Sequence, residues 1–170
     1  MGSEMCIRDS RKIVESSANM KSLYIIGNGG SASISSHFAT DLMKAGSQNG
    51  MRIAAISLVD SAPVITATSN DFSYEEVFSW QISKLAREGD LLFAISSSGN
   101  SANIVKAVEL AKELNLVTVS LTGFDGGKVS TISDFSIVTK SRIGNYGPVE
   151  DAHAIICHYL SRCLTLYPKF

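Results

Sequence analysis

Two segments rich in glycine and serine are the parts of this sequence best suited to chemistry. They are Gly27–Ser31, which follows the apolar run Leu23–Ile26, and Ser96–Ser101, which follows Leu91–Ile95. Glycine lets a backbone approach an anion closely, and a helix start offers unpaired N–H groups and the positive end of its dipole. Serine hydroxyls add donors without adding charge. Together, the two loops predict a binding site for a phosphate group.

The loops do not match the common nucleotide-binding motifs. Neither is followed by the Gly-Lys-Ser/Thr of a Walker P-loop, and Gly27–Gly30 does not complete G-x-G-x-x-G, because position 32 is Ala32. A sugar phosphate is therefore favoured over a nucleotide. The simpler alternative is that both loops are only tight turns between strands and helices.

Acid and base groups occur in two segments with helical spacing. His37 and Asp41 are four residues apart and project from one face of the helix predicted over Ser31–Ala45. A carboxylate and an imidazole at this spacing can share a metal ion or divide acid and base work. The alternative is an ordinary surface pair.

The last predicted helix carries a second set of such groups. Glu150 and Asp151 stand at its start, where acids suit the helix dipole, and His153 and His158 follow. A histidine there can transfer protons, or it can be a hydrogen-bonded packing residue. The sequence leaves these alternatives open.

Composition excludes several classes of function. Fifteen basic and sixteen acidic residues give a net charge of −1, so there is no basic field for nucleic acid and no polybasic run for a membrane surface. No apolar run approaches the roughly twenty residues that span a bilayer. Cys6, Cys157 and Cys163 are odd in number and form no C-x-x-C pair. We therefore expect a cytoplasmic protein without a direct nucleic-acid or membrane partner.

Apolar runs and helical spacings alternate along the chain. Strands are expected at Leu23–Ile26, Ile53–Leu58, Leu91–Ile95, Val117–Leu121 and Phe135–Val138. Helices are expected at Arg11–Met20, Ser31–Ala45, Ala62–Thr68, Tyr74–Ala86, Ala102–Leu114 and from Val149 to about Leu166, with a short turn at Val129–Ile132.

This alternation predicts an α/β fold, doubly wound and flavodoxin-like, with a five-stranded parallel sheet and helices on both faces. Ligands bind such sheets beyond the carboxyl ends of the strands, where the strand order reverses. Both glycine and serine loops belong to that edge. Residues 11–170 are expected to form a single domain, and residues 1–10, which show no periodic pattern, are expected to be non-native or disordered.

The same motifs resemble the SIS (sugar isomerase) domains of the phosphoheptose isomerase family. The resemblance runs from about Ser22 to Leu166 and is carried by Gly27–Ser31, His37–Ala39, Ser57-Leu58, Asn70-Asp71, Ser96–Asn103, Leu121–Lys128, Val149–His153 and His158. It implies a homotetramer that isomerises sedoheptulose 7-phosphate to D-glycero-D-manno-heptose 7-phosphate through an enediol, on the way to lipopolysaccharide heptose. A related, non-catalytic branch of the fold, which binds a phosphosugar or the bacterial replication initiator protein, is the alternative.

The resemblance also implies roles for individual residues. The substrate-binding residues would be Asn28, Gly29, Gly30, Ser31, Asp71, Ser96, Ser97, Ser98 and Ser101. Asp41 would be the base, and His158 would handle the complementary proton. Some family members hold zinc, and its ligands here would be His37, Asp41, Glu150 and His158. The chain departs from the family pattern at two of these positions, since the family has glutamate at the place of Asp41 and glutamine at the place of Glu150.

Overall fold

The computed structural model describes residues 21–48, 50 and 52–166. Segment 1–10 and the helix expected over Arg11–Met20 lie outside these residues. The strands are β1 (Ser22–Gly27), β2 (Ala54–Ser57), β3 (Leu91–Ser96), β4 (Val117–Gly123) and β5 (Phe135–Thr139). The helices are α2 (Gly30–Gln48), α3 (Ala62–Asp71), the 3-10 turn η1 (Tyr74–Glu76), α4 (Ser79–Leu85), α5 (Ala102–Glu113), α6 (Gly127–Ile132) and α7 (Tyr146–Leu166).

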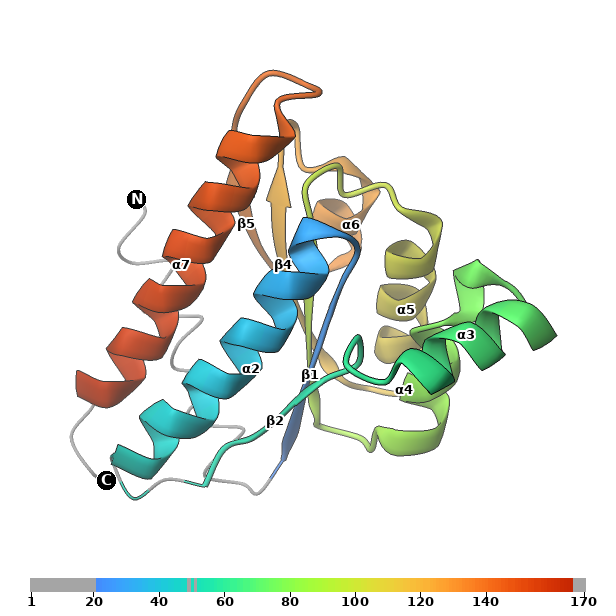
Figure 1. Cartoon of the computed structure of the whole chain (residues 1–170), viewed down its shortest axis with the longest axis horizontal. Helices are drawn as coiled ribbons and strands as arrows, with labels where there is room; N and C mark the ends of the chain where they lie inside the picture. The colour runs from blue at the N-terminus through green and yellow to red at the C-terminus, as the bar shows by residue number, and fades with distance from the viewer. Residues whose placement is uncertain (1–20, 49, 51, 167–170) are drawn as a thin grey trace.

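The five strands form one parallel sheet in the order β2-β1-β3-β4-β5, which confirms the predicted flavodoxin-like topology. Helices cover both faces (Figure 1). Alternate residues of β1 explain the uninterrupted apolar sequence: Leu23 and Ile25 pack with α2 and α7, whereas Tyr24 and Ile26 pack with α4, α5 and α6. A strand buried on both faces needs apolar residues at every position.

The strand order reverses between β1 and β3, and this places the two glycine and serine loops side by side. The register pairs Gly27 at the end of β1 with Ile95 near the end of β3. The first loop opens α2 at Gly30, and the second opens α5 at Ala102. Segments distant in sequence therefore meet at one point of the sheet edge, as this topology requires.

Several helix boundaries differ from the sequence-based expectation. The single helix predicted over Tyr74–Ala86 is wrong, because the chain forms η1 and then α4. Val77 and Phe78 between them are both buried, and Gln81 Nε2 donates to the carbonyls of Leu58 and Val77, so the chain turns here to satisfy buried groups.

The other differences lie at helix ends. Helix α2 continues to Gln48, α3 continues through Asn70 and Asp71, and α7 begins at Tyr146 rather than at Val149. Pro148 is tolerated in the first turn of α7 because its missing N–H has no partner there in any case. In the described part of the chain, none of the helices combines the length and apolar character needed to cross a bilayer.

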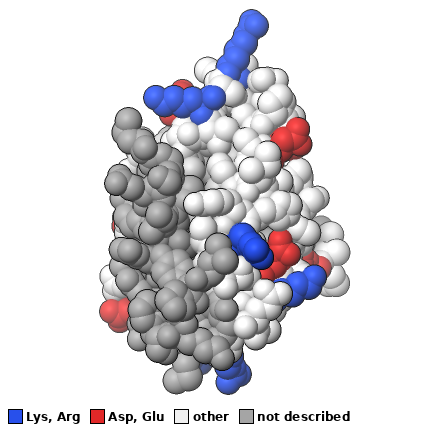
Figure 2. All heavy atoms as spheres, turned by 90° about the vertical axis from the view of Figure 1, so that its left-hand side faces the viewer, with Lys and Arg blue, Asp and Glu red and all other residues white. Residues whose placement is uncertain are grey.

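Charged groups on the face in Figure 2 are of both signs and lie scattered rather than gathered in one patch. Among the described charged residues, Asp134 has the side chain with the most hydrogen bonds to other elements. It joins β4 to β5 and α5. Its carboxylate accepts hydrogen bonds from the backbone N–H of Thr118 at 2.9 Å, from Thr118 Oγ1 at 2.8 Å and from Lys112 Nζ at 2.6 Å. Burial alone would raise the pKa of Asp134, but these bonds prevail and hold it below the ordinary value.

The Asp134→Asn variant tests this linkage through its dependence on pH. A carboxyl whose pKa is lowered on folding stabilises the protein above its unfolded pKa of about 3.9, and this stabilisation is lost as the pH falls through the folded pKa. We expect wild type to exceed the variant by about 1 kcal/mol in free energy of unfolding at pH 7. The difference should shrink in urea denaturation below about pH 4. Glu109→Gln, which removes only the exposed pair with Lys128, is the control. A difference that stays constant down to pH 3 would contradict this account.

Candidate active site

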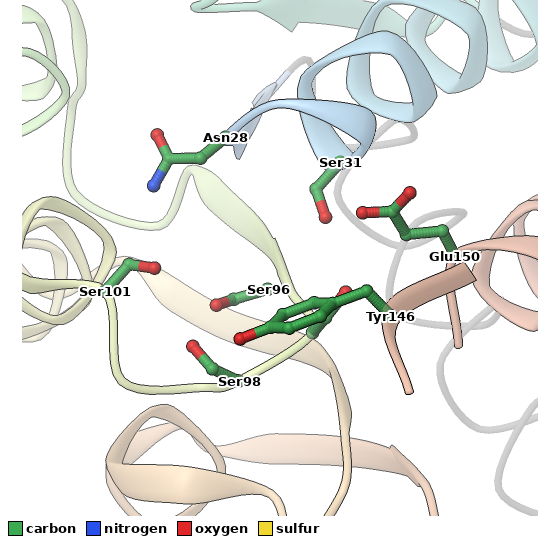
Figure 3. A pocket seen from close by; sticks show the side chains of 8 residues that line it. Asn28, Ser31, Ser96, Ser98, Ser101, Tyr146 and Glu150 are labelled. Carbon is green, nitrogen blue, oxygen red and sulfur yellow. The ribbon is translucent and has the colours of Figure 1, made fainter. Parts of the chain in front are cut away.

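A pocket opens at the carboxyl edge of the sheet, where the two glycine and serine loops meet (Figure 3). Its wall is formed by Asn28, Ser31, Ser96, Ser97, Ser98, Ser101, Tyr146 and Glu150. We call it the serine pocket. The first two residues come from the β1–α2 loop and the start of α2, the four that follow come from the end of β3 and the β3–α5 loop, and the last two come from α7. Six of the nine predicted substrate-binding residues thus lie on one wall.

The β3–α5 loop owes its shape to close contact with the loop after β4. The N–H of Gly123 donates to the Ser97 carbonyl at 3.0 Å, and the N–H of Val129 donates to the Gly99 carbonyl at 2.9 Å. Gly99 has a φ of 64°, and a Cβ built there would overlap the carbonyl oxygen of Gly126. Glycine is needed at this position both for the positive φ and for the approach of the two backbones.

The β1–α2 loop and the start of α2 are shaped by the carboxylate of Glu150. A Cβ on Gly30 would overlap the carboxylate of Glu150, so glycine allows that carboxylate to lie against the first turn of α2. This is the positive end of the helix dipole, which favours an anion. The contact also shows that the first turns of α2 and α7 lie side by side at the pocket wall.

The donors on the wall of the serine pocket are neutral groups. Of the described residues, no lysine or arginine is part of its wall. Ser97 Oγ is buried and has no hydrogen-bond partner among the residues that the structure describes, so its donor is available to a ligand. His153 lies on α7 and is completely buried, and burial lowers its pKa below the ordinary value; neither ring nitrogen has a hydrogen-bond partner among the described residues. His153 is therefore a neutral packing residue at pH 7.

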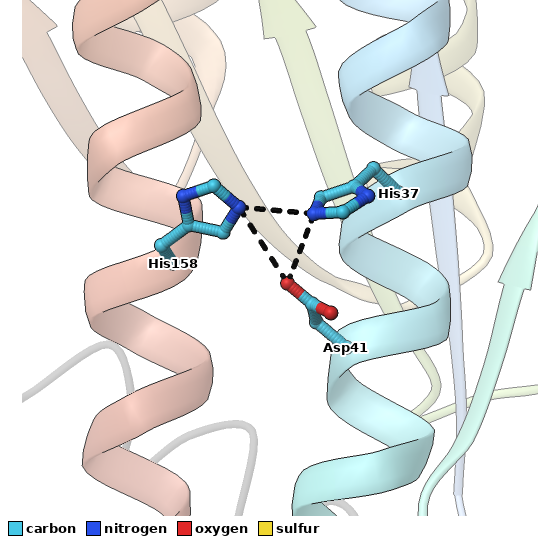
Figure 4. Close-up of side chains that lie close together, drawn as sticks. All are labelled: His37, Asp41 and His158. Carbon is cyan, nitrogen blue, oxygen red and sulfur yellow. Dashed lines mark hydrogen bonds and ion pairs between the residues drawn. The ribbon is translucent and has the colours of Figure 1, made fainter.

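A second group of polar side chains bridges α2 and α7 farther along the helices (Figure 4). The Nε2 atoms of His37 and His158 are 2.9 Å apart. Asp41 Oδ2 lies 3.3 Å from His37 Nε2 and 3.8 Å from His158 Nε2. The imidazoles are more than half exposed, with side-chain exposures of 60% and 56%, against 23% for Asp41. This group, which we call the His–Asp cluster, is open to solvent.

The His–Asp cluster has the donors and spacing of a metal site. One ligand atom of each residue lies within 4.8 Å of the others. Ligands bound at about 2.0–2.1 Å in a tetrahedron are about 3.3 Å apart, and two nitrogens with one oxygen form a donor set that zinc accepts. The three separations given above bracket this value. The residues therefore fit a zinc ion.

Two predicted site residues do not lie where the sequence analysis placed them. Among the described residues, the cluster consists of His37, Asp41 and His158, and Glu150 is not part of it. Instead, Glu150 lines the serine pocket, because it stands about two turns before His158 on the same helix. Asp71 is exposed at the end of α3, bonded to Asn70 Nδ2 at 2.9 Å, and does not line the pocket.

Three residues at the site were not predicted from the sequence. Tyr146 lines the pocket and packs edge-on against Phe124, with ring centroids 5.1 Å apart. Asn103 and Tyr74 both bond the side chain of Asn28. Tyr146 could have been considered because it follows the carboxyl end of β5, but the contacts of Asn103 and Tyr74 are long-range and leave no local signal.

Comparison with known proteins identifies the family of this chain. The SIS domain family matches residues 5–123. A phosphoheptose isomerase of Helicobacter pylori (strain P12) is 38% identical over 161 residues, which cover 95% of this chain and 83% of that protein. A phosphoheptose isomerase structure from Neisseria gonorrhoeae superposes with a TM-score of 0.84 at 32% identity, covering 95% of this chain and 85% of the other. One from Francisella tularensis gives 0.85 at 29% identity, with the same coverage. This chain belongs to the phosphoheptose isomerase family of SIS-domain proteins.

The contact between Gly99 and Gly126 can be tested with a matched pair of variants. Gly99→Ala and Gly144→Ala both replace a glycine of positive φ, 64° and 89°, so both carry a backbone strain of about 1–3 kcal/mol. A Cβ at Gly144 has no neighbour within 4 Å. We expect Gly99→Ala to lower the affinity for inorganic phosphate at least about tenfold, whereas Gly144→Ala should leave it unchanged, as measured by calorimetry. Equal losses in the two variants would show that the contact does not shape the pocket.

Proposed function

We propose that this protein is a phosphosugar isomerase that interconverts sedoheptulose 7-phosphate and D-glycero-D-manno-heptose 7-phosphate. The observation that carries the proposal is the placement of a serine pocket and a His–Asp cluster at two levels of one pair of helices. The phosphoheptose isomerase relatives support the same activity.

The separation of the two centres suits a long substrate. Gly30 and Glu150 lie together at the pocket, and His37 and His158 lie together at the cluster. At 1.5 Å of rise per residue, these levels are about 10 Å apart along α2 and about 12 Å apart along α7. With bond lengths of about 1.5 Å, an extended seven-carbon chain with its phosphate ester spans on the order of 10 Å. A sugar phosphate bound by its phosphate would therefore bring its far end to the cluster.

In this proposal, Ser31, Ser96, Ser97, Ser98 and Ser101 bind the phosphate. These neutral donors must offset the repulsion between the phosphate and the Glu150 carboxylate, which lines the same pocket. Asn28 and the backbone of Gly29 and Gly30 complete the binding loop. Asp71, at the end of α3, would reach the sugar only through a change in position or through another subunit.

The chemistry requires one base and one group that neutralises developing charge on oxygen. Asp41 contacts both histidines through Oδ2, so Oδ1 is the oxygen that would take the proton from C1 of the ketose. The C–H electron pair becomes the C1–C2 double bond, and the carbonyl oxygen at C2 takes a proton from His158, giving the enediol. Return of the carbon proton to C2, with the proton of the C1 hydroxyl passing back to His158, gives the aldose.

We also propose that His37, Asp41 and His158 hold a zinc ion. With zinc bound, His158 Nε2 would be a ligand rather than a proton donor, and the metal would supply Lewis-acid stabilisation of the charge that develops on the sugar oxygens in place of that proton. The convergence of two ring nitrogens and a carboxylate oxygen supports this assignment. Glu150 would join the ligands only if its side chain left the pocket wall.

A homotetramer in the cytoplasm completes the proposal. The outer faces of α2 and α7 expose the apolar side chains of Met43, Ile155 and Tyr159, which another subunit could cover. Cys157 is buried and, like Cys163, forms no disulfide within the described part of the chain. Burial, with the nearby charge of Asp41, raises the pKa of Cys157 to about 12, so this thiol stays protonated and acts as a packing residue.

An isomerase assay tests the function. Purified wild type, supplied with zinc, should convert sedoheptulose 7-phosphate to the aldose. Asp41→Ala and His158→Ala should each lower kcat by roughly 10²–10⁴, the usual contribution of a proton-transfer group, while binding of inorganic phosphate changes little.

Asp151→Ala provides the matched control, because Asp151 is an exposed acid next to Glu150 that takes part in neither centre. It should keep wild-type kcat. Elemental analysis of the same preparations should find zinc in wild type and little in Asp41→Ala. Tight sugar-phosphate binding without turnover by wild type would overturn the isomerase proposal in favour of a non-catalytic SIS domain.

A further inference from the structure

The side chain of Asn28 is held by two residues that do not line the serine pocket. Asn28 Nδ2 donates to Asn103 Oδ1 at 2.8 Å, and Asn103 Nδ2 donates back to Asn28 Oδ1 at 2.9 Å. The hydroxyl of Tyr74 also donates to Asn28 Oδ1, at 3.0 Å. Asn103 is 2% exposed and lies in the first turn of α5, whereas Tyr74 is 55% exposed and begins η1.

These three bonds determine what Asn28 can offer a ligand. A side-chain amide has two acceptor sites on its oxygen and two N–H donors. Asn103 and Tyr74 occupy both acceptor sites of Oδ1, and Asn103 also takes one N–H. A single N–H of Asn28 therefore remains, on a residue that lines the pocket (Figure 3).

Tyr74 selects between two orientations of this amide. The reciprocal pair of Asn28 and Asn103 would be equally satisfied if both amides turned over together and exchanged oxygen with nitrogen. A phenol hydroxyl is a stronger donor than acceptor, so it favours the orientation in which Asn28 Oδ1 faces Tyr74. Burial of Asn103 reinforces the pair, because a buried amide left without a partner is costly.

We propose that Asn103 and Tyr74 are positioning residues that fix the Asn28 amide as an N–H donor to an oxygen of the bound sugar phosphate. The nature of that ligand rests on the proposed function. The pair also connects the β1–α2 loop to α5 across the reversal in strand order, so the same bonds hold the two halves of the pocket in register.

Tyr74→Phe tests the proposal, since it removes one exposed hydroxyl and leaves the fold intact. The dissociation constant for sedoheptulose 7-phosphate should rise about threefold to tenfold, with an equal rise in KM and an unchanged kcat. Tyr24→Phe is the matched control, because its hydroxyl donates to the Leu85 carbonyl at 2.9 Å, remote from the pocket. It should lower the midpoint of thermal unfolding and leave the dissociation constant unchanged.

A double-mutant cycle shows whether Tyr74 acts through Asn28. In an Asn28→Ala background, Tyr74→Phe should have no further effect on the dissociation constant. Asn103→Asp, which can accept from Asn28 but cannot donate to it, should weaken binding in wild type and not in that background. A threefold or larger effect of Tyr74→Phe that persists in Asn28→Ala would overturn the proposal, and so would unchanged affinity in the single variant.

A comparison of inorganic phosphate with the sugar phosphate shows whether the Asn28 N–H donates to a phosphate oxygen or to a sugar oxygen. Equal weakening of inorganic phosphate and of the sugar phosphate by Tyr74→Phe would place the acceptor on the phosphate, whereas weakening of the sugar phosphate alone would place it on the sugar. Both results support positioning of Asn28. Because these are equilibrium measurements, they decide the inference even if wild type binds the sugar phosphate without turnover, the result that would defeat the isomerase function.

Discussion

The packing of α2 against α7 on one face of the sheet is the contact on which the rest of the site depends. Phe38 and Leu42 of α2 share a buried core with Leu160 and Leu164 of α7 and with the central strands. The helices run in the same direction, because Gly30 meets Glu150 at their first turns and His37 meets His158 about two turns later. One apolar interface therefore places the serine pocket at one level and the His–Asp cluster at another.

The other constraint is the interlocking of three loops at the carboxyl edge of the sheet. The loop after β3 lies between the loop after β1 and the loop after β4. Backbone hydrogen bonds join it to the loop after β4, and the side chains of Asn28 and Asn103 join the loop after β1 to α5, the helix that the loop after β3 opens. A pocket of hydroxyls needs this rigidity. Without a lysine or arginine on its described wall, it can bind an anion well only if its neutral donors are already in place.

The sequence was most informative where the signal was local. Continuous apolar runs predicted all five strands of the described chain, since strands buried on both faces cannot alternate. The two serine loops and the spacing of His37 and Asp41 predicted the pocket and part of the cluster. The break between η1 and α4 was missed, because buried contacts of Gln81 with Leu58 overrode helical spacing.

Contacts between residues that are far apart in the chain were harder to predict from the sequence. Glu150 was grouped with His158 by resemblance, but the rise of α7 places it at the pocket, beside Gly30. Asn28 and Asn103 are 75 positions apart, and only the reversal in strand order brings their amides together. Tyr74 reaches Asn28 from a turn whose helical character was itself mispredicted.

The central claim is that the distance between the serine pocket and the His–Asp cluster selects the length of the substrate. The most direct test compares kcat/KM for sedoheptulose 7-phosphate with kcat/KM for a three-carbon ketose phosphate, dihydroxyacetone phosphate. A phosphate held in the pocket would bring the reacting carbons of the seven-carbon substrate to Asp41, whereas those of the triose would stop short by several ångströms. The account predicts turnover of the heptulose phosphate at least about a thousandfold more efficient than that of the triose. Comparable efficiency for the two substrates would contradict it.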